Sequence, residues 1–255
     1  MVAPILAADA ISLSFGSIRA LEGISLAVSG TEIVSVIGPN GAGKSSLLNC
    51  ISGFYRPQSG RIVFDTHDIT RLRAPDRARL GIARTFQGLQ TYESMTVREN
   101  ILSGFHHRMR TGLFDAFAYW PRTRAEEARF TQEAEEIIEL LELEELRHAL
   151  VGQLPYGLRK RTDLGRALAL GPKILVMDEP MAGMNSEEKG DLARFILDIR
   201  DGRKIPVILV EHDMEVVLDL SDRIMVMDWG RTVAEGPPAV IQTDPRVVAA
   251  YLGQA

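Results

Sequence analysis

Four short segments of the chain consist almost entirely of aliphatic and β-branched residues. They are 32–38 (EIVSVIG), 173–179 (KILVMDE), 206–212 (PVILVEH) and 223–230 (RIMVMDWG). Apolar residues at successive positions, rather than at alternate ones, are typical of a parallel sheet that is covered on both faces. Helix-like stretches at 44–52 and 186–201 lie between these segments. Because strands and helices alternate in this way, we predict the α/β fold class with a mostly parallel sheet.

The interval from about 88 to 160 has a different pattern, with no convincing strand. Its apolar positions recur at helical spacing, and its many glutamates fall on the opposite side of the same helix. The residues expected on the apolar stripe are Phe130, Ala134, Ile137, Ile138 and Leu141. We therefore expect a helical subdomain inserted into the α/β core, with the acidic run as its solvated face. An aromatic run at 112–121 is open to two interpretations, packing within the insert or contact with a membrane surface or partner.

Composition and charge argue against some functional classes, such as nucleic-acid binding through an overall basic charge. The 255 residues include 29 Lys and Arg against 34 Asp and Glu, so the net charge of −5 gives no overall basic field for nucleic acid. The single cysteine, Cys50, is expected to be a small buried apolar residue. The N-terminus does not resemble a secretory signal, and no apolar run approaches the roughly 18 residues of a spanning helix. We expect a soluble chain whose membrane role, if it has one, comes through a partner.

A phosphate-binding loop follows the first predicted strand. The string GPNGAGKS at 38–45 matches G-x-x-x-x-G-K-[ST] between a strand and a helix. Glycines let the backbone surround an anion, lysine supplies a mobile charge, and the serine hydroxyl is placed for Mg²⁺. The residues expected to contact the nucleotide are Gly38, Pro39, Asn40, Gly41, Ala42, Gly43, Lys44, Ser45 and Ser46. The sequence therefore predicts a nucleoside triphosphate with Mg²⁺, and Lys44 and Ser45 as its principal side-chain contacts.

Two adjacent carboxylates end the strand at 173–179. Asp178 is placed to hold Mg²⁺ through water, and Glu179 to orient and deprotonate the attacking water. A strand that ends in Asp-Glu is common by itself, so this interpretation depends on the phosphate-binding loop before it. No Asn-Lys-x-Asp string for guanine occurs, which favours ATP over GTP.

With these motifs the chain resembles the ATP-binding subunit of an ABC transporter over nearly its whole length. The resemblance implies a P-loop NTPase core with an N-terminal antiparallel β portion and an inserted α-helical subdomain. It divides the chain into core residues 1–87, a helical subdomain at 88–160 that ends in the family's signature motif, core residues 161–236, and a C-terminal tail at 237–255.

The resemblance also assigns roles to side chains outside the phosphate-binding loop. Phe15 matches the aromatic residue that stacks on adenine. Gln87, in ARTFQGLQ, matches the glutamine that senses Mg²⁺ and the attacking water, and residues 87–105 match the groove for a coupling helix of a membrane subunit. His212, 33 residues beyond Glu179 (212 − 179), matches the switch histidine at the γ-phosphate.

The signature motif departs from the family's L-S-G-G-Q. Here the string is LPYGL at 154–158, in which Pro155 lacks both the hydroxyl and the N–H, and Leu158 lacks the amide. The N–H groups of Tyr156 and Gly157 remain able to meet the γ-phosphate bound by the opposite protomer. Each lost hydrogen bond to a charged group is worth about 1.5–3 kcal/mol, so the motif is expected to be weakened.

Within the family, the chain most resembles the branched-chain amino-acid importer ATPases and their urea and amide relatives. The implied partners are transmembrane permease subunits, a second ATPase subunit that is identical or different, and an extracytoplasmic substrate-binding protein, with no nucleic acid. The implied location is peripheral, on the cytoplasmic face of the plasma or inner membrane. Two rival interpretations remain: a soluble ABC ATPase that acts on DNA or ribosomes, and a regulatory nucleotide binder that hydrolyses weakly.

Overall fold

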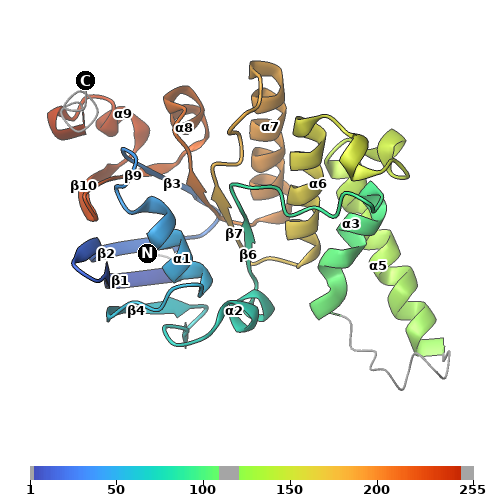
Figure 1. Cartoon of the computed structure of the whole chain (residues 1–255), viewed down its shortest axis with the longest axis horizontal. Helices are drawn as coiled ribbons and strands as arrows, with labels where there is room; N and C mark the ends of the chain where they lie inside the picture. Colours follow the sequence, from blue (N-terminus) through green and yellow to red (C-terminus); the bar gives the residue numbers. More distant parts are fainter. Residues whose placement is uncertain (1–2, 109–120, 248–255) are drawn as a thin grey trace.

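The structure is a computed structural model that describes residues 3–108 and 121–247 (Figure 1). Its main sheet has six strands in the order β10-β9-β3-β8-β7-β6. Their bounds are β3 (Ile33–Ile37), β6 (Ile82–Thr85), β7 (Ile174–Asp178), β8 (Val207–Val210), β9 (Arg223–Asp228) and β10 (Arg231–Gly236). The five from β9 to β6 are parallel, and β10 pairs antiparallel at one edge. The four predicted strands are thus confirmed, and the α/β class with them.

A second sheet is antiparallel, with strand order β2-β1-β4-β5. It consists of β1 (Pro4–Phe15), β2 (Ile18–Ser29), β4 (Ser59–Phe64) and β5 (His67–Asp68). This is the expected N-terminal antiparallel portion. Helix α1 (Lys44–Ser52) packs Leu47 and Ile51 into one buried cluster with strands of both sheets. Cys50 lies in the same cluster, as expected, and burial raises the pKa of its thiol to about 11.

Helices form one buried cluster with the opposite face of the main sheet. They are α3 (Val97–Ser103), α5 (Pro121–Leu140), α6 (Tyr156–Ala169) and α7 (Ser186–Arg203). In Figure 1, α3, α5 and α6 lie together at the side of α7 away from the antiparallel sheet. The five residues of the predicted apolar stripe are all buried in the cluster that joins these helices to the sheet. The insert is therefore helical, and the described part of 88–160 contains no strand apart from one isolated bridge at Thr96 and Leu150.

The remaining elements are short. They are α2 (Ala74–Leu80), α8 (Met214–Leu220), α9 (Pro238–Ile241) and the 3₁₀ turns η1 (Gly104–His107), η2 (Glu144–Leu146) and η3 (Val151–Gln153). The boundary expected at residue 160 lies inside the continuous helix α6. The aromatic side chains of the run at 112–121 lie outside the described residues. Among the helices within 3–108 and 121–247, none is long and apolar enough to cross a membrane.

Candidate functional site

The phosphate-binding loop connects β3 to α1, where we expected it, and two of its glycines are required by the backbone. Gly38 has φ 148° and Gly43 has φ 101°, conformations that L side chains rarely adopt. A Cβ atom at Gly38 would lie 2.0 Å from the Met227 carbonyl oxygen, and one at Gly43 would lie 2.4 Å from that of Ala20. The loop is thus packed against neighbouring backbone, which fixes its shape as an anion cradle.

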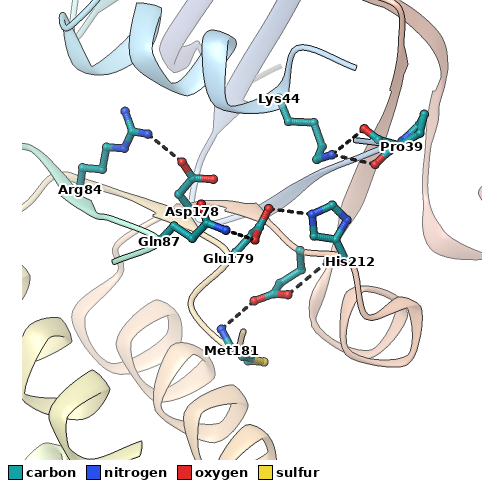
Figure 2. A network of polar contacts seen from close by, with 10 residues as sticks. Pro39, Lys44, Arg84, Gln87, Asp178, Glu179, Met181 and His212 are labelled. Carbon is teal, nitrogen blue, oxygen red and sulfur yellow. Dashed lines mark hydrogen bonds and ion pairs between the residues drawn. The ribbon is translucent and has the colours of Figure 1, made fainter. Parts of the chain in front are cut away.

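Lys44 is the first residue of α1, and its side chain folds back over the loop. Its Nζ donates hydrogen bonds to the carbonyl oxygens of Gly38 at 2.7 Å and Pro39 at 2.9 Å (Figure 2). The residue is only 6% exposed. Burial lowers the pKa of the ammonium group, while the charges of Glu179 and Asp178 oppose that shift. The lysine charge is therefore confined between the cradle and the two carboxylates.

Asp178 ends β7 with its two carboxylate oxygens in different environments. Oδ2 accepts a hydrogen bond from Nη2 of Arg84 at 2.8 Å, and both side chains are buried. Oδ1 is also buried, and it has no hydrogen-bond partner among the residues that the structure describes. Mg²⁺ typically takes one or two carboxylates and completes its shell with phosphate and water. The free Oδ1 therefore fits a magnesium ion, with the hydroxyl of Ser45 available at the start of α1.

Glu179 follows Asp178 and is held from both sides. Its Oε1 lies 2.7 Å from Nε2 of His212, and its Oε2 accepts a hydrogen bond from Nε2 of Gln87 at 2.8 Å (Figure 2). Glu179 has φ 48°, a left-handed conformation that is unfavourable for a residue other than glycine. Such strain is found mainly where the surrounding structure fixes a functional side chain.

Sheet order explains why these three residues meet. Gln87 follows β6, Glu179 follows β7 and His212 follows β8, and the three strands are parallel neighbours. Strand β3, which leads into the phosphate-binding loop, lies beside β8. The carboxyl ends of all four strands thus bring the predicted residues to one edge, where ligands bind in open α/β sheets.

A buried carboxylate that we did not single out lies directly behind this group. Glu211 is 3% exposed, and its oxygens accept hydrogen bonds from the backbone N–H of Met181 at 2.8 Å and of His212 at 3.2 Å. Burial raises its pKa, although the two backbone hydrogen bonds oppose the shift. Glu211 therefore connects the loop after β7 to the backbone of His212.

The signature segment starts α6 without a side-chain cap. Pro155 is the N-cap residue, so it precedes the first helical turn. Gly157 is buried, and a Cβ there would lie 2.4 Å from Oε1 of Glu188. Leu158 packs against the main helical core, which is a physical reason for an apolar residue at that position.

The basic residues after the signature have defined partners. Lys160 donates a hydrogen bond from Nζ to the backbone carbonyl oxygen of Gln87 at 2.9 Å, and Arg159 and Arg161 pair with Glu93 and Asp191. Helix α6 is thereby connected to the glutamine beside Glu179.

Three expected site residues, Phe15, Tyr156 and Gly157, lie apart from this cluster. Phe15 ends β1, is 47% exposed, and packs edge to face on Tyr55 with ring centroids 5.2 Å apart. In the described part of the chain, neither Phe15 nor Gly157 makes a hydrogen bond or ring contact with Lys44, Asp178 or Glu179. Phe15 is exposed, as a residue available to a nucleotide base must be.

Comparison with known proteins identifies the family. The family described as ABC transporter matches residues 21–182, well over half of the chain. The chain belongs to the ABC transporter family. A second family, described as branched-chain amino acid ATP-binding cassette transporter, matches residues 231–255. The resemblance inferred from the motifs is confirmed, and the chain is an ATP-binding cassette.

Relatives of this cassette align over its full length. A protein of Salmonella typhimurium named high-affinity branched-chain amino acid transport ATP-binding protein LivG is 37% identical over 255 residues, which is 100% of both chains. The Pseudomonas aeruginosa protein named BraF, with the same description, is also 37% identical over 100% of both chains. A crystal structure of the ADP conformation of an ATP-binding cassette of an ABC transporter superposes with a TM-score of 0.86 at 36% identity, covering 98% of this chain and 99% of that one.

Proposed function

We propose that this cassette powers import of branched-chain or other hydrophobic amino acids, with Glu179 as its catalytic base. The observation that carries the catalytic assignment is the pair of hydrogen bonds from Gln87 and His212 to Glu179, beside the buried Lys44. The substrate class is supported by the names of the full-length relatives and by the family matched at 231–255. Urea or amide uptake is the alternative within the same subfamily.

The proposed reaction is transfer of the γ-phosphoryl group of ATP to water. The backbone of 38–46 and Lys44 bind the phosphates, and Phe15 stacks on adenine. Ser45, Gln87 and Asp178 would hold Mg²⁺, which would supply positive charge to the phosphate oxygens. Glu179 accepts the proton of the attacking water, and His212 holds the carboxylate and contacts the γ-phosphate. These side chains act mainly by positioning and electrostatics.

The proposed assembly is a dimer of cassettes beneath permease subunits. Tyr156 and Gly157 of each cassette would meet the γ-phosphate bound by the other, and a groove at 87–105 would receive the coupling helix of a permease. The proposed division of the chain has four parts, at 1–87, 88–160, 161–236 and 237–255. It assigns the signature to the helical part, and α6 continues from there into the core. A peripheral place at the cytoplasmic membrane face and an extracytoplasmic substrate-binding protein complete the proposal.

One observation favours a second function, a regulatory nucleotide binder that hydrolyses weakly. The N-cap of α6 is a proline without a hydroxyl, so the opposite site receives fewer hydrogen bonds than a serine would supply.

Light scattering after size-exclusion chromatography tests the proposal on Glu179→Gln, with ATP and Mg²⁺ or without them. The variant keeps the size and shape of the Glu179 side chain and removes its basicity, so we expect it to dimerise with ATP while hydrolysis is lost. Lys44→Ala, which weakens phosphate binding, is the control that should remain monomeric. A Glu179→Gln protein that binds ATP but stays monomeric would contradict the working homodimer. If wild type hydrolyses ATP no faster than the background rate, the result would favour the regulatory nucleotide binder.

A further inference from the structure

Arg84 is a charged residue within the main sheet, on β6, and it contacts the carboxylate expected to face the metal (Figure 2). Its guanidinium group donates to Asp178 through Nη2 at 2.8 Å and to Oδ1 of Asn49 through Nη1 at 2.6 Å. The rings of Phe86 and Phe54 lie 5.0 and 5.8 Å from its Cζ atom. The Arg84 side chain is only 6% exposed. It is therefore fixed by a carboxylate, an amide on α1 and two aromatic rings.

This contact makes the two oxygens of Asp178 unequal. Oδ2 is occupied by Arg84, whereas Oδ1 is buried and has no hydrogen-bond partner in the described part of the chain. Lys44 attracts Asp178 through its charge but does not contact it, because its Nζ is bonded to the carbonyl oxygens of Gly38 and Pro39. Removing the cation that contacts a buried carboxylate strongly lowers the stability of a fold, because the negative charge stays buried without a partner. Arg84 is thus the cation that contacts Asp178 directly among the described residues.

We propose that Arg84 acts on the metal site through its charge: it is the resident counter-ion of Asp178, it occupies Oδ2, and it leaves Oδ1 for Mg²⁺. The inference rests on the proposed function, since it takes Asp178 as the metal-facing carboxylate. Arg84 pairs with Asp178 in the absence of Mg²⁺, and its positive charge weakens the attraction of the site for the metal. The site therefore binds Mg²⁺ with ATP less tightly than an unpaired aspartate would, and releases it more readily.

The test is a Mg²⁺ titration of the full chain at saturating ATP, on wild type and on Arg84→Met. The quantity measured at each Mg²⁺ concentration is the midpoint temperature of thermal unfolding. Methionine keeps the packing on Phe54 and Phe86 and removes the charge. Arg61→Met is the matched control, because Arg61 pairs with Asp68 at the same 2.8 Å but on the surface. We expect Arg84→Met to melt several degrees lower without Mg²⁺ and to reach half of its Mg²⁺ response at about three- to tenfold lower concentration. Arg61→Met should match wild type in both respects.

Two further variants separate the charge effect from general damage to the fold. Arg84→Lys keeps the charge without the planar fork, so its Mg²⁺ midpoint should stay near that of wild type. The double variant Arg84→Met with Asp178→Asn removes both charges, and it should melt higher than either single variant. The comparison of melting temperatures among the double and single variants is made without Mg²⁺. It can also be made if Arg84→Met is obtained in low yield.

The outcomes are distinct. An unchanged or higher Mg²⁺ midpoint in Arg84→Met, or a double variant that melts at or below the lower single variant, would overturn the role of Arg84 while the ATPase assignment stands. A wild-type protein whose melting does not respond to ATP with Mg²⁺ would overturn the proposed function, and this inference with it.

Discussion

Oε1 of Glu179 and Nε2 of His212 lie 2.7 Å apart, although 33 residues separate them in the chain. The contact forms because β7 and β8 are parallel neighbours whose carboxyl ends are in register, with Asp178 opposite Val210. Gln87 contacts the other oxygen of Glu179 from the next strand, so the carboxylate is held by both adjacent strands. A base that is oriented from two sides needs little reorganisation before it accepts a proton.

Replacing His212 by alanine should lower the rate of ATP hydrolysis by about 10²–10³-fold, since removing one preorganised hydrogen-bonding group from an active site typically costs that much. The Kd for ATP should change little, because Lys44 and the phosphate-binding loop are untouched. Steady-state hydrolysis and equilibrium nucleotide binding check the two effects. His106→Ala, an exposed residue of η1, is the control, and equal losses in both variants would contradict the role of His212.

Arg77 on α2 should be essential for stability. It is 1% exposed and donates hydrogen bonds to the carbonyl oxygens of four residues, Cys50, Ile51, Thr70 and Leu72, so it caps the C-terminal end of α1. Arg77→Met should reduce the free energy of unfolding by about 3 kcal/mol or more, as several hydrogen bonds to a charged group are lost. Urea denaturation measures this, with exposed Arg79→Met expected within about 0.5 kcal/mol of wild type. Similar values for both variants would refute the capping role.

Glu211 should make stability depend on pH. Its pKa is raised by burial above the usual 4.5, so the folded chain holds its proton more tightly than the unfolded chain. The free energy of unfolding of wild type, relative to Glu211→Gln, should be highest below pH 4.5 and fall as the pH rises through the folded pKa. Denaturation of both proteins across this range checks the sign. A difference that is constant, or that grows with pH, would contradict it.

Pro155→Ser should strengthen the signature. A serine at the N-cap accepts a hydrogen bond from the first turn of α6 and stabilises the helix by about 1 kcal/mol. Its hydroxyl also becomes available to the opposite nucleotide, so ATP-dependent dimerisation and hydrolysis should both increase. Pro237→Ser is a matched control, because Pro237 is likewise an uncapped N-cap, at α9. A gain in stability without a gain in dimerisation would show that the signature is not limiting.

Features that depend on local spacing were predicted from the sequence. These features are the phosphate-binding loop, the four apolar strands and the stripe from Phe130 to Leu141. Each of them is formed by residues that lie close together in the sequence. Local conformation and burial follow from periodicity and from the glycines that a turn requires. The N-cap position of Pro155 was not predicted, because one residue at a helix start is below the precision of a periodic pattern.

Other features were decided only by the tertiary structure. Arg84 contacts Asp178 across 94 residues of the sequence, and Glu211 contacts Met181 across 30. No local sequence pattern predicts either pair. An arginine in the short string IART was the available signal for the first, but it does not say which carboxylate it contacts. The partners are chosen by the strand order β8-β7-β6, which differs from the order along the chain. The sequence by itself determined which chemical groups are present at the sheet edge, whereas sheet order determined which of them touch, because contacts between parallel strands depend on long-range pairing.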